Sequence, residues 1–147
     1  MFKQPIIIES NFFLKKMSIF FDVAGMMLFP FLIIKTYPEP KTRGESIKYA
    51  FLQQRLIHHE KIHFYQYKEL LVVGFLLVYL FDWVHGLIKY RNFTKAYMRI
   101  RMEQEAYEHQ SKFFFRHEHA NILSYKPEEY IDYCDRREKF AWRKYKV

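Results

Sequence analysis

The sequence predicts a mainly α-helical domain with a small β element near its N-terminus. Half of the 147 residues are hydrophobic and a fifth are aromatic, so one domain of this length can bury a sizeable core. Only 4 Gly and 5 Pro are available for tight turns, which favours long helices over a β sandwich. We therefore expect one domain over residues 1–147: strands and loops in 1–45, helices in 46–115 and a helical tail in 116–147.

Two short apolar runs predict strands in the N-terminal part. Residues 5–9 and 27–35 are rich in Ile, Leu and Phe over lengths that suit strands. Pro30 lies inside the second run and predicts an edge strand or a bend, because proline cannot donate to a strand ladder. Residues 36–45 contain two prolines and a glycine and read as a loop, after which Ser46 is a candidate N-cap.

Three helices are expected after that loop. The first covers residues 47–68, where neither Gly nor Pro occurs and one face carries side chains at helical spacing. The second covers residues 70–90 and either follows or continues the first. It is apolar nearly all round until Asp82, as expected of a helix packed on several sides. The third covers residues 101–115, and Pro127 suits the first turn of a further helix in the tail.

Charge and cysteine content limit the partners and the compartment. Lys and Arg number 24 against 16 acidic residues, a formal charge of +8 that suits an anionic partner or surface. The basic residues are spread along the chain without a recognition module, so a nucleic-acid partner is not expected. The single cysteine, Cys134, excludes an intramolecular disulfide and indicates a reducing compartment. We expect a cytoplasmic protein, with peripheral attachment to a membrane as an open alternative.

Two apolar stretches, residues 17–34 and 70–88, approach the length of a membrane span. Asp22 interrupts the first, and Asp82 and His85 interrupt the second, which leaves apolar runs of about 12 residues. Basic residues flank both stretches, so the charge asymmetry that orients spans is missing. These stretches therefore predict buried core elements rather than spans, and attachment at the interface stays open.

The string His58-His59-Glu60-Lys61-Ile62-His63 carries the most chemical information. A spacing of four residues places His59 and His63 one turn apart on the same helix face, where both imidazoles can reach one zinc ion. Glu60 follows the first histidine and can take a proton from metal-activated water. His58 points about 100° away from His59 and is not expected to be a ligand. The alternative is a bland helix that carries this spacing by chance.

A third ligand is sought in the later segment that contains Glu103 and Glu105, either of which could coordinate zinc. The pattern H-E-x-x-H followed by E-x-x-A resembles the glutamate-zincin metallopeptidases, and this resemblance implies Glu103 as the third ligand. The chain departs from that family at Tyr107, where many members carry an aspartate. More narrowly, residues 25–110 resemble short bacterial proteins with a predicted zincin site, through Phe29-Pro30-Phe31, His59 to Gln66, Lys95-Ala96-Tyr97 and Glu103 to Tyr107.

The resemblance implies a zinc metallopeptidase with a zincin-like pair of site helices and a peptide or protein substrate. Glu60 would act as general base and then protonate the leaving amine. Gln66, His85 and Tyr107 are candidates for supporting the ligands.

Two assignments stay open at this point. The segment 29–34 is expected to form the cleft edge that holds an extended peptide, and His109, His117 or His119 could stabilise an oxyanion. The alternative function is a non-catalytic basic helical protein on anionic membrane surfaces.

Overall fold

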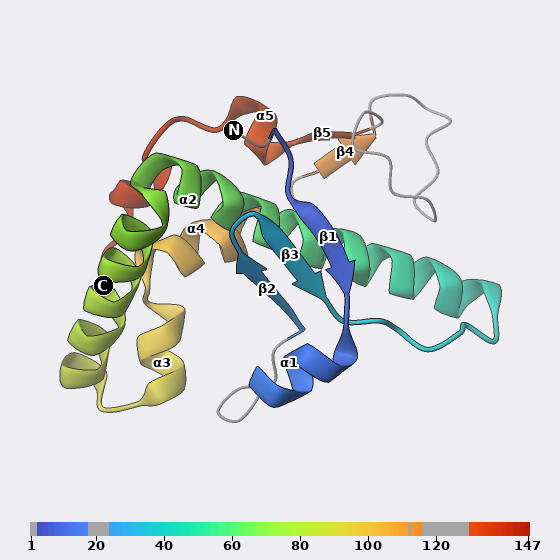
Figure 1. Ribbon diagram of the computed structural model, residues 1–147, viewed down its shortest axis with the longest axis horizontal. Helices are drawn as coiled ribbons and strands as arrows, with labels where there is room; N and C mark the ends of the chain where they lie inside the picture. Colours follow the sequence, from blue (N-terminus) through green and yellow to red (C-terminus); the bar gives the residue numbers. More distant parts are fainter. Residues whose placement is uncertain (1–2, 18–23, 112, 116–129) are drawn as a thin grey trace.

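The computed structural model describes residues 3–17, 24–111, 113–115 and 130–147 and is mainly helical, with a three-stranded sheet near the N-terminus (Figure 1). The elements in chain order are β1 (Ile6–Glu9), α1 (Asn11–Met17), β2 (Gly25–Leu28), β3 (Phe31–Ile34), α2 (Arg43–Tyr90), α3 (Phe93–Met98), α4 (Arg101–His109), β4 (Phe113–Phe115), β5 (Tyr130–Asp132), α5 (Tyr133–Arg136) and the 3₁₀ helix η2 (Ala141–Lys144). The predicted fold class, mainly helical with a small N-terminal β element, is confirmed.

The sheet has the order β1-β3-β2, with β1 parallel and β2 antiparallel to the central strand β3. Of the two alternatives predicted for residues 27–35, the edge strand is wrong and the bend is confirmed. The chain reverses at Phe29–Pro30, which is a cis peptide bond, so the run forms two paired strands and β3 lies in the middle. Pro30 sits in the turn, where its missing N–H removes no ladder bond.

Helix α2 is bent into two arms that meet at Leu71 (Figure 1). Leu71 has φ 58° and ψ 172°, which interrupts the helical backbone. We call residues 43–70 the first arm and residues 72–90 the second arm. The two predicted helices are confirmed. The cap is Thr42 rather than Ser46, because the Thr42 hydroxyl accepts a hydrogen bond from the N–H of Glu45 at 3.1 Å and starts the helix earlier.

The main core lies between the sheet and the first arm. Leu32 and Ile34 of β3 are fully buried and pack with Ile57 and Phe64 of the first arm. At Gly25 of β2 a Cβ atom would come within 2.8 Å of the Leu56 side chain, so the absence of a side chain lets β2 approach the helix closely. The sheet is thereby held against the stretch of helix that carries the histidine motif.

The second arm packs on one side only. A Cβ at Gly86 would lie 3.1 Å from the Cα of Ala96, so glycine permits close contact with α3. Asp82 is fully buried and accepts three hydrogen bonds from Arg101. Two come from the guanidinium, at 2.7 and 2.8 Å, and one comes from the backbone N–H of Arg101 at 3.1 Å. The opposite side of the arm is exposed, so the expectation of a helix packed on several sides is wrong.

One helix among the described residues, α2, is long and apolar enough to cross a membrane by length and composition. Its most apolar 18-residue window has a mean hydropathy of 2.0, and 17% of that window is buried. The core helix of a soluble protein can be equally long and apolar, but most of its residues are buried. Helix α2 differs from such a helix because little of its apolar window is buried.

The third predicted helix ends earlier than expected. α4 stops at His109, and residues 113–115 form β4, which pairs with β5 in a second, two-stranded sheet. Three consecutive phenylalanines favour an extended conformation over the predicted helix. The predicted start of a helix at Pro127 lies outside the described residues; α5 begins at Tyr133.

Candidate metal centre

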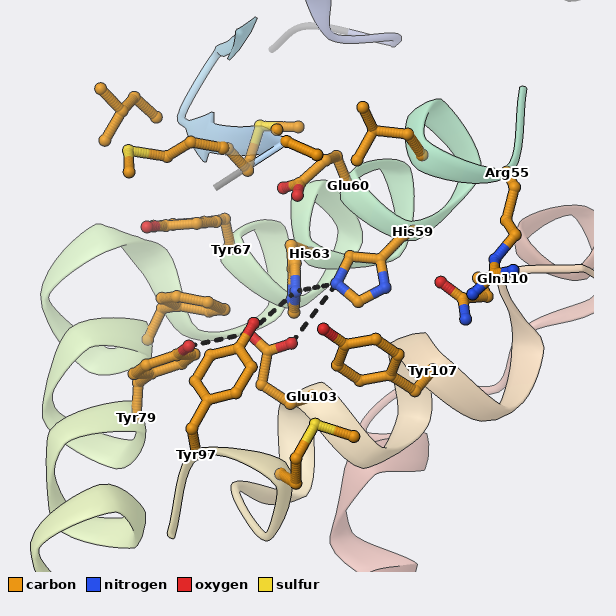
Figure 2. Close-up of a pocket in the computed structure, with 18 of the residues that line it drawn as sticks. Arg55, His59, Glu60, His63, Tyr67, Tyr79, Tyr97, Glu103, Tyr107 and Gln110 are labelled. Atoms are coloured by element: carbon orange, nitrogen blue, oxygen red, sulfur yellow. Dashed lines mark hydrogen bonds and ion pairs between the residues drawn. The ribbon is translucent and has the colours of Figure 1, made fainter. Parts of the chain in front are cut away.

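Three residues of the first arm and one of α4 meet at a buried cluster (Figure 2). His59, Glu60 and His63 lie within two turns of the first arm, and Glu103 projects toward them from α4. All four side chains are buried. The helix therefore presents both imidazoles on one side, and the packing of α4 against the first arm supplies the carboxylate.

The donor atoms of this cluster are separated by distances that suit a small metal ion. The Nε2 atoms of His59 and His63 are 3.2 Å apart. Glu103 Oε2 lies 3.3 Å from His59 Nε2, and Glu103 Oε1 lies 3.4 Å from His63 Nε2. Four ligands at the zinc distances of 2.0–2.1 Å in tetrahedral geometry are about 3.3–3.4 Å from one another. The three side chains thus fit zinc without rearrangement.

Hydrogen bonds assign the tautomer of His63. Gln66 uses its amide nitrogen to donate to Glu105 Oε2 at 2.9 Å and to the Met102 carbonyl at 3.2 Å. The Gln66 oxygen therefore faces His63 Nδ1, 2.7 Å away, and accepts its proton. This leaves His63 Nε2 directed into the cluster, as a metal-ligating imidazole requires.

The electrostatics of the cluster are those of an anion held between two imidazoles. Burial alone would raise the pKa of Glu103, but the imidazoles of His63 and His59 outweigh it and hold that pKa well below the usual range. Burial alone would lower the pKa of His63, whereas Glu103, Glu60 and the bond to Gln66 raise it to about 9. Glu103 Oε2 is buried without a hydrogen-bond partner among the described residues. A divalent cation at this point would satisfy that oxygen and replace the imidazole proton.

Glu60 lies beside the cluster without belonging to the donor set. Burial raises the pKa of Glu60 above its usual range, although His59, His63 and a hydrogen bond from the Met27 N–H favour the carboxylate form. A carboxyl group with a raised pKa exchanges protons more readily near neutral pH. The N–H of Met27 in β2 holds this carboxyl from the side opposite the helix.

Three tyrosines surround Glu103 (Figure 2). The Tyr79 hydroxyl donates to Glu103 Oε1 at 2.7 Å. Tyr97 and Tyr107 are hydrogen-bonded to each other, and the Tyr107 ring lies 4.7 Å from the His59 ring, centroid to centroid. Burial and Glu103 raise the pKa values of all three phenols, which therefore keep their protons and can donate. The sequence analysis did not identify Tyr79. The only signal in the sequence is a hydroxyl group within an otherwise apolar helix, on the side that faces Glu103 in the structure.

The cluster opens into a cavity of about 820 Å³. Its walls come from β2, both arms of α2, α3 and α4, and most of them are apolar or aromatic. Arg55 is the only Lys or Arg among its lining residues. The size and lining suit a side chain or short segment of a larger molecule next to the metal-fitting cluster.

Two other predicted site residues, Glu105 and His85, do not belong to the donor set. Glu105 accepts hydrogen bonds from Arg137 at 2.6 and 3.0 Å and from the Tyr133 hydroxyl at 2.9 Å. It thus supports Gln66 from behind and does not reach the donor set. His85 is exposed, with its ring 6.2 Å from that of Phe81, so the structure does not bring it to the cluster.

Two further histidines among the described residues, His58 and His109, also lie apart from the donor set. His58 Nδ1 is 3.0 Å from the Gln110 carbonyl oxygen. His109 stacks on Tyr133 with ring centroids 3.7 Å apart. The candidates His117 and His119 lie outside the described residues.

Comparison with models of known protein families, with curated proteins and with solved structures found no match.

Proposed function

We propose that this protein is a zinc-dependent hydrolase that cleaves peptide bonds, with His59, His63 and Glu103 as zinc ligands. The observation that carries the proposal is the set of donor separations, 3.2, 3.3 and 3.4 Å, inside a buried cluster. Random burial of two histidines and a glutamate does not require tetrahedral spacing. The first arm and α4 together would then form a zincin-like pair of site helices.

The protein's own residues supply the acid and base chemistry in this proposal. Zinc held by His59, His63 and Glu103 would polarise a carbonyl group and lower the pKa of water, so that a strong nucleophile is available near neutral pH. Glu60 is positioned to take a proton from the attacking water and to return it to the leaving amine. Its raised pKa suits both steps, because the group must gain and lose a proton in one cycle. Tyr97 and Tyr107 line the cavity, and their hydroxyl groups could donate hydrogen bonds to the carbonyl oxygen as it becomes negative.

We place the cleft edge at β2. The sequence-based expectation placed it over residues 29–34, but β3 is the central strand and both of its edges are paired. β2 lines the cavity through Gly25 to Leu28, and its outer edge is unpaired among the described strands. An extended peptide could add to this edge by backbone hydrogen bonds.

Substitution of Glu60 by Gln tests the proposal, because it removes the base and keeps size and shape. Glu60→Gln should retain zinc and fold while hydrolysis of a peptide library falls by about 10²–10⁴-fold. The exposed Glu39→Gln serves as a matched control and should keep full activity.

Three results would count against the assignment. An unchanged rate in zinc-loaded Glu60→Gln would remove Glu60 from the mechanism. Loss of zinc from Glu60→Gln would make Glu60 a ligand instead of a base. A zinc-loaded parent chain that cleaves no peptide would leave a non-catalytic zinc site.

A further inference from the structure

The second arm of α2 exposes a broad apolar face. Leu77, Phe81 and Ile88 are 64%, 67% and 73% exposed. The exposed members follow one another at helical spacing and cover one side of the arm, and they are Val73, Leu76, Leu77, Leu80, Phe81, Val84 and Ile88. We call these residues the apolar face. No charged side chain interrupts them on that side of the arm. The face is therefore a continuous apolar surface, like the apolar side of an amphipathic helix that lies in a membrane interface.

The charged residues that lie near the apolar face in the sequence are almost all positive. Between residues 70 and 102 the only acidic residue is Asp82, which is buried and paired with Arg101. Arg91, Lys95 and Arg99 lie just beyond the end of the arm and are exposed. An apolar face followed in the chain by exposed cations, with the one acidic residue of this stretch buried and paired, is complementary to a bilayer with anionic headgroups.

The opposite side of the arm is already committed to the domain. It carries the Asp82–Arg101 ion pair, the Tyr79 hydroxyl bound to Glu103, and the close contact of Gly86 with Ala96 of α3. A spanning orientation would carry this ion pair and Lys95 of α3 into the hydrocarbon, which is energetically unfavourable. The geometry therefore favours a helix that lies in the interface plane, with one side in lipid and the other on the protein.

We propose that the apolar face docks on an anionic lipid bilayer and holds the protein at the membrane surface. Leu76 belongs both to this face and to the wall of the cavity, and the exposed Met98 of α3 lines the cavity as well. Docking therefore brings the cavity wall next to the bilayer surface. The inference rests on exposure and charge and is independent of the metal chemistry.

Cosedimentation of the full chain with vesicles tests the proposal. The parent should bind phosphatidylcholine vesicles that contain phosphatidylserine and bind pure phosphatidylcholine vesicles much more weakly. Raising the ionic strength to about 1 M, where the Debye length is about 3 Å, should release a large part of the bound protein. Lys95→Gln and Arg99→Gln should each weaken binding about fivefold. Replacement of Lys41 and Lys48, exposed cations distant in sequence from the apolar face, should change binding little.

The apolar contribution is tested by replacing Leu77 and Phe81 with Ser together. This double variant should lose vesicle binding by about tenfold or more for each side chain, with an unchanged circular dichroism spectrum. Ile47→Ser, at an exposed apolar position of the first arm, is the matched control and should bind like the parent.

Four results would overturn the proposal: no binding by the parent, binding that the Leu77 and Phe81 replacements leave intact, extraction from membranes by detergent alone, or a dimer that these replacements dissociate without any vesicle binding. The third result would indicate a span, and the fourth a second copy of the chain as the occupant. Vesicle binding requires no substrate. Failure of the docking proposal can therefore be distinguished from failure of the proposed hydrolase function.

Discussion

The two arms of α2 belong to one helix in sequence but have opposite surfaces. The first arm buries polar side chains, among them His59, Glu60, His63 and Gln66, beneath the sheet and α4. The second arm buries Phe75, Asp82 and Gly86 and exposes a side made of Leu, Val, Phe and Ile. Each arm thus departs on one side from the usual distribution, in which polar groups face water and apolar groups face the core.

The two arms differ in which groups they bury and which they expose. Buried polar groups cost free energy unless they are paired, so those of the first arm mark the candidate site. An exposed apolar side costs solubility and indicates a surface that meets another apolar phase. The kink at Leu71 lets one helix carry both surfaces, because it changes the direction of the second arm relative to the first.

The largest effect on stability is expected from Arg137→Ala. Arg137 pairs with Glu69 at the end of the first arm and with Glu105 of α4. Removal of the guanidinium would leave two largely buried carboxylates without their cation, at a cost of about 3–5 kcal/mol. Chemical denaturation measures this change. Arg136→Ala, at the exposed neighbouring position, should stay within about 0.5 kcal/mol. Equal stability of the two variants would show that the buried pairs do not stabilise the first arm.

The contrast within the second arm is tested at Phe75 and Leu77, two residues apart. Phe75 is buried and stacks on Tyr67 with ring centroids 3.7 Å apart, so Phe75→Ala should lower the free energy of unfolding by about 3–5 kcal/mol. Leu77 is 64% exposed, and Leu77→Ala should change it by about 0.5 kcal/mol or less. A large loss of stability in Leu77→Ala would mean that the apolar face is covered in the free protein.

A smaller effect is expected from Gln66→Met, which keeps the volume and removes the hydrogen bond to His63 Nδ1. Loss of a partner that orients a ligating histidine weakens metal binding by about 10–100-fold. Competition with a zinc-binding dye measures the affinity. Gln53→Met, on the same arm but bonded only to Glu9 among the contacts described, should retain the parent affinity. If both variants bind zinc equally, the tautomer of His63 is not set by Gln66.

Much of the site could be predicted from the sequence because its central signal is local. The spacing of His59 and His63 is a property of one helix and needs no tertiary information. Glu103 was reached only through a resemblance, since nothing local distinguishes it from Glu105. The structure separates the two by packing: Glu105 faces Arg137, whereas Glu103 faces the imidazoles.

The missing parts of the prediction depend on contacts between distant segments. The central place of β3 follows from its pairing with β1, which lies 25 residues earlier in the chain, and no periodicity shows it. The role of Tyr79 follows from the angle between the arms, which depends on the backbone at Leu71. The exposure of one side of the second arm could not be predicted, because an apolar helix packed on several sides and one with an exposed apolar side have the same composition.

Metal analysis tests the central claim most directly. Protein purified without a metal-affinity tag and equilibrated with zinc should hold one zinc ion per chain, and His63→Ala should hold none while keeping the helical circular dichroism of the parent. Retention of stoichiometric zinc by His63→Ala, or a parent chain that binds no zinc at saturation, would contradict the assignment of His59, His63 and Glu103 as a metal centre.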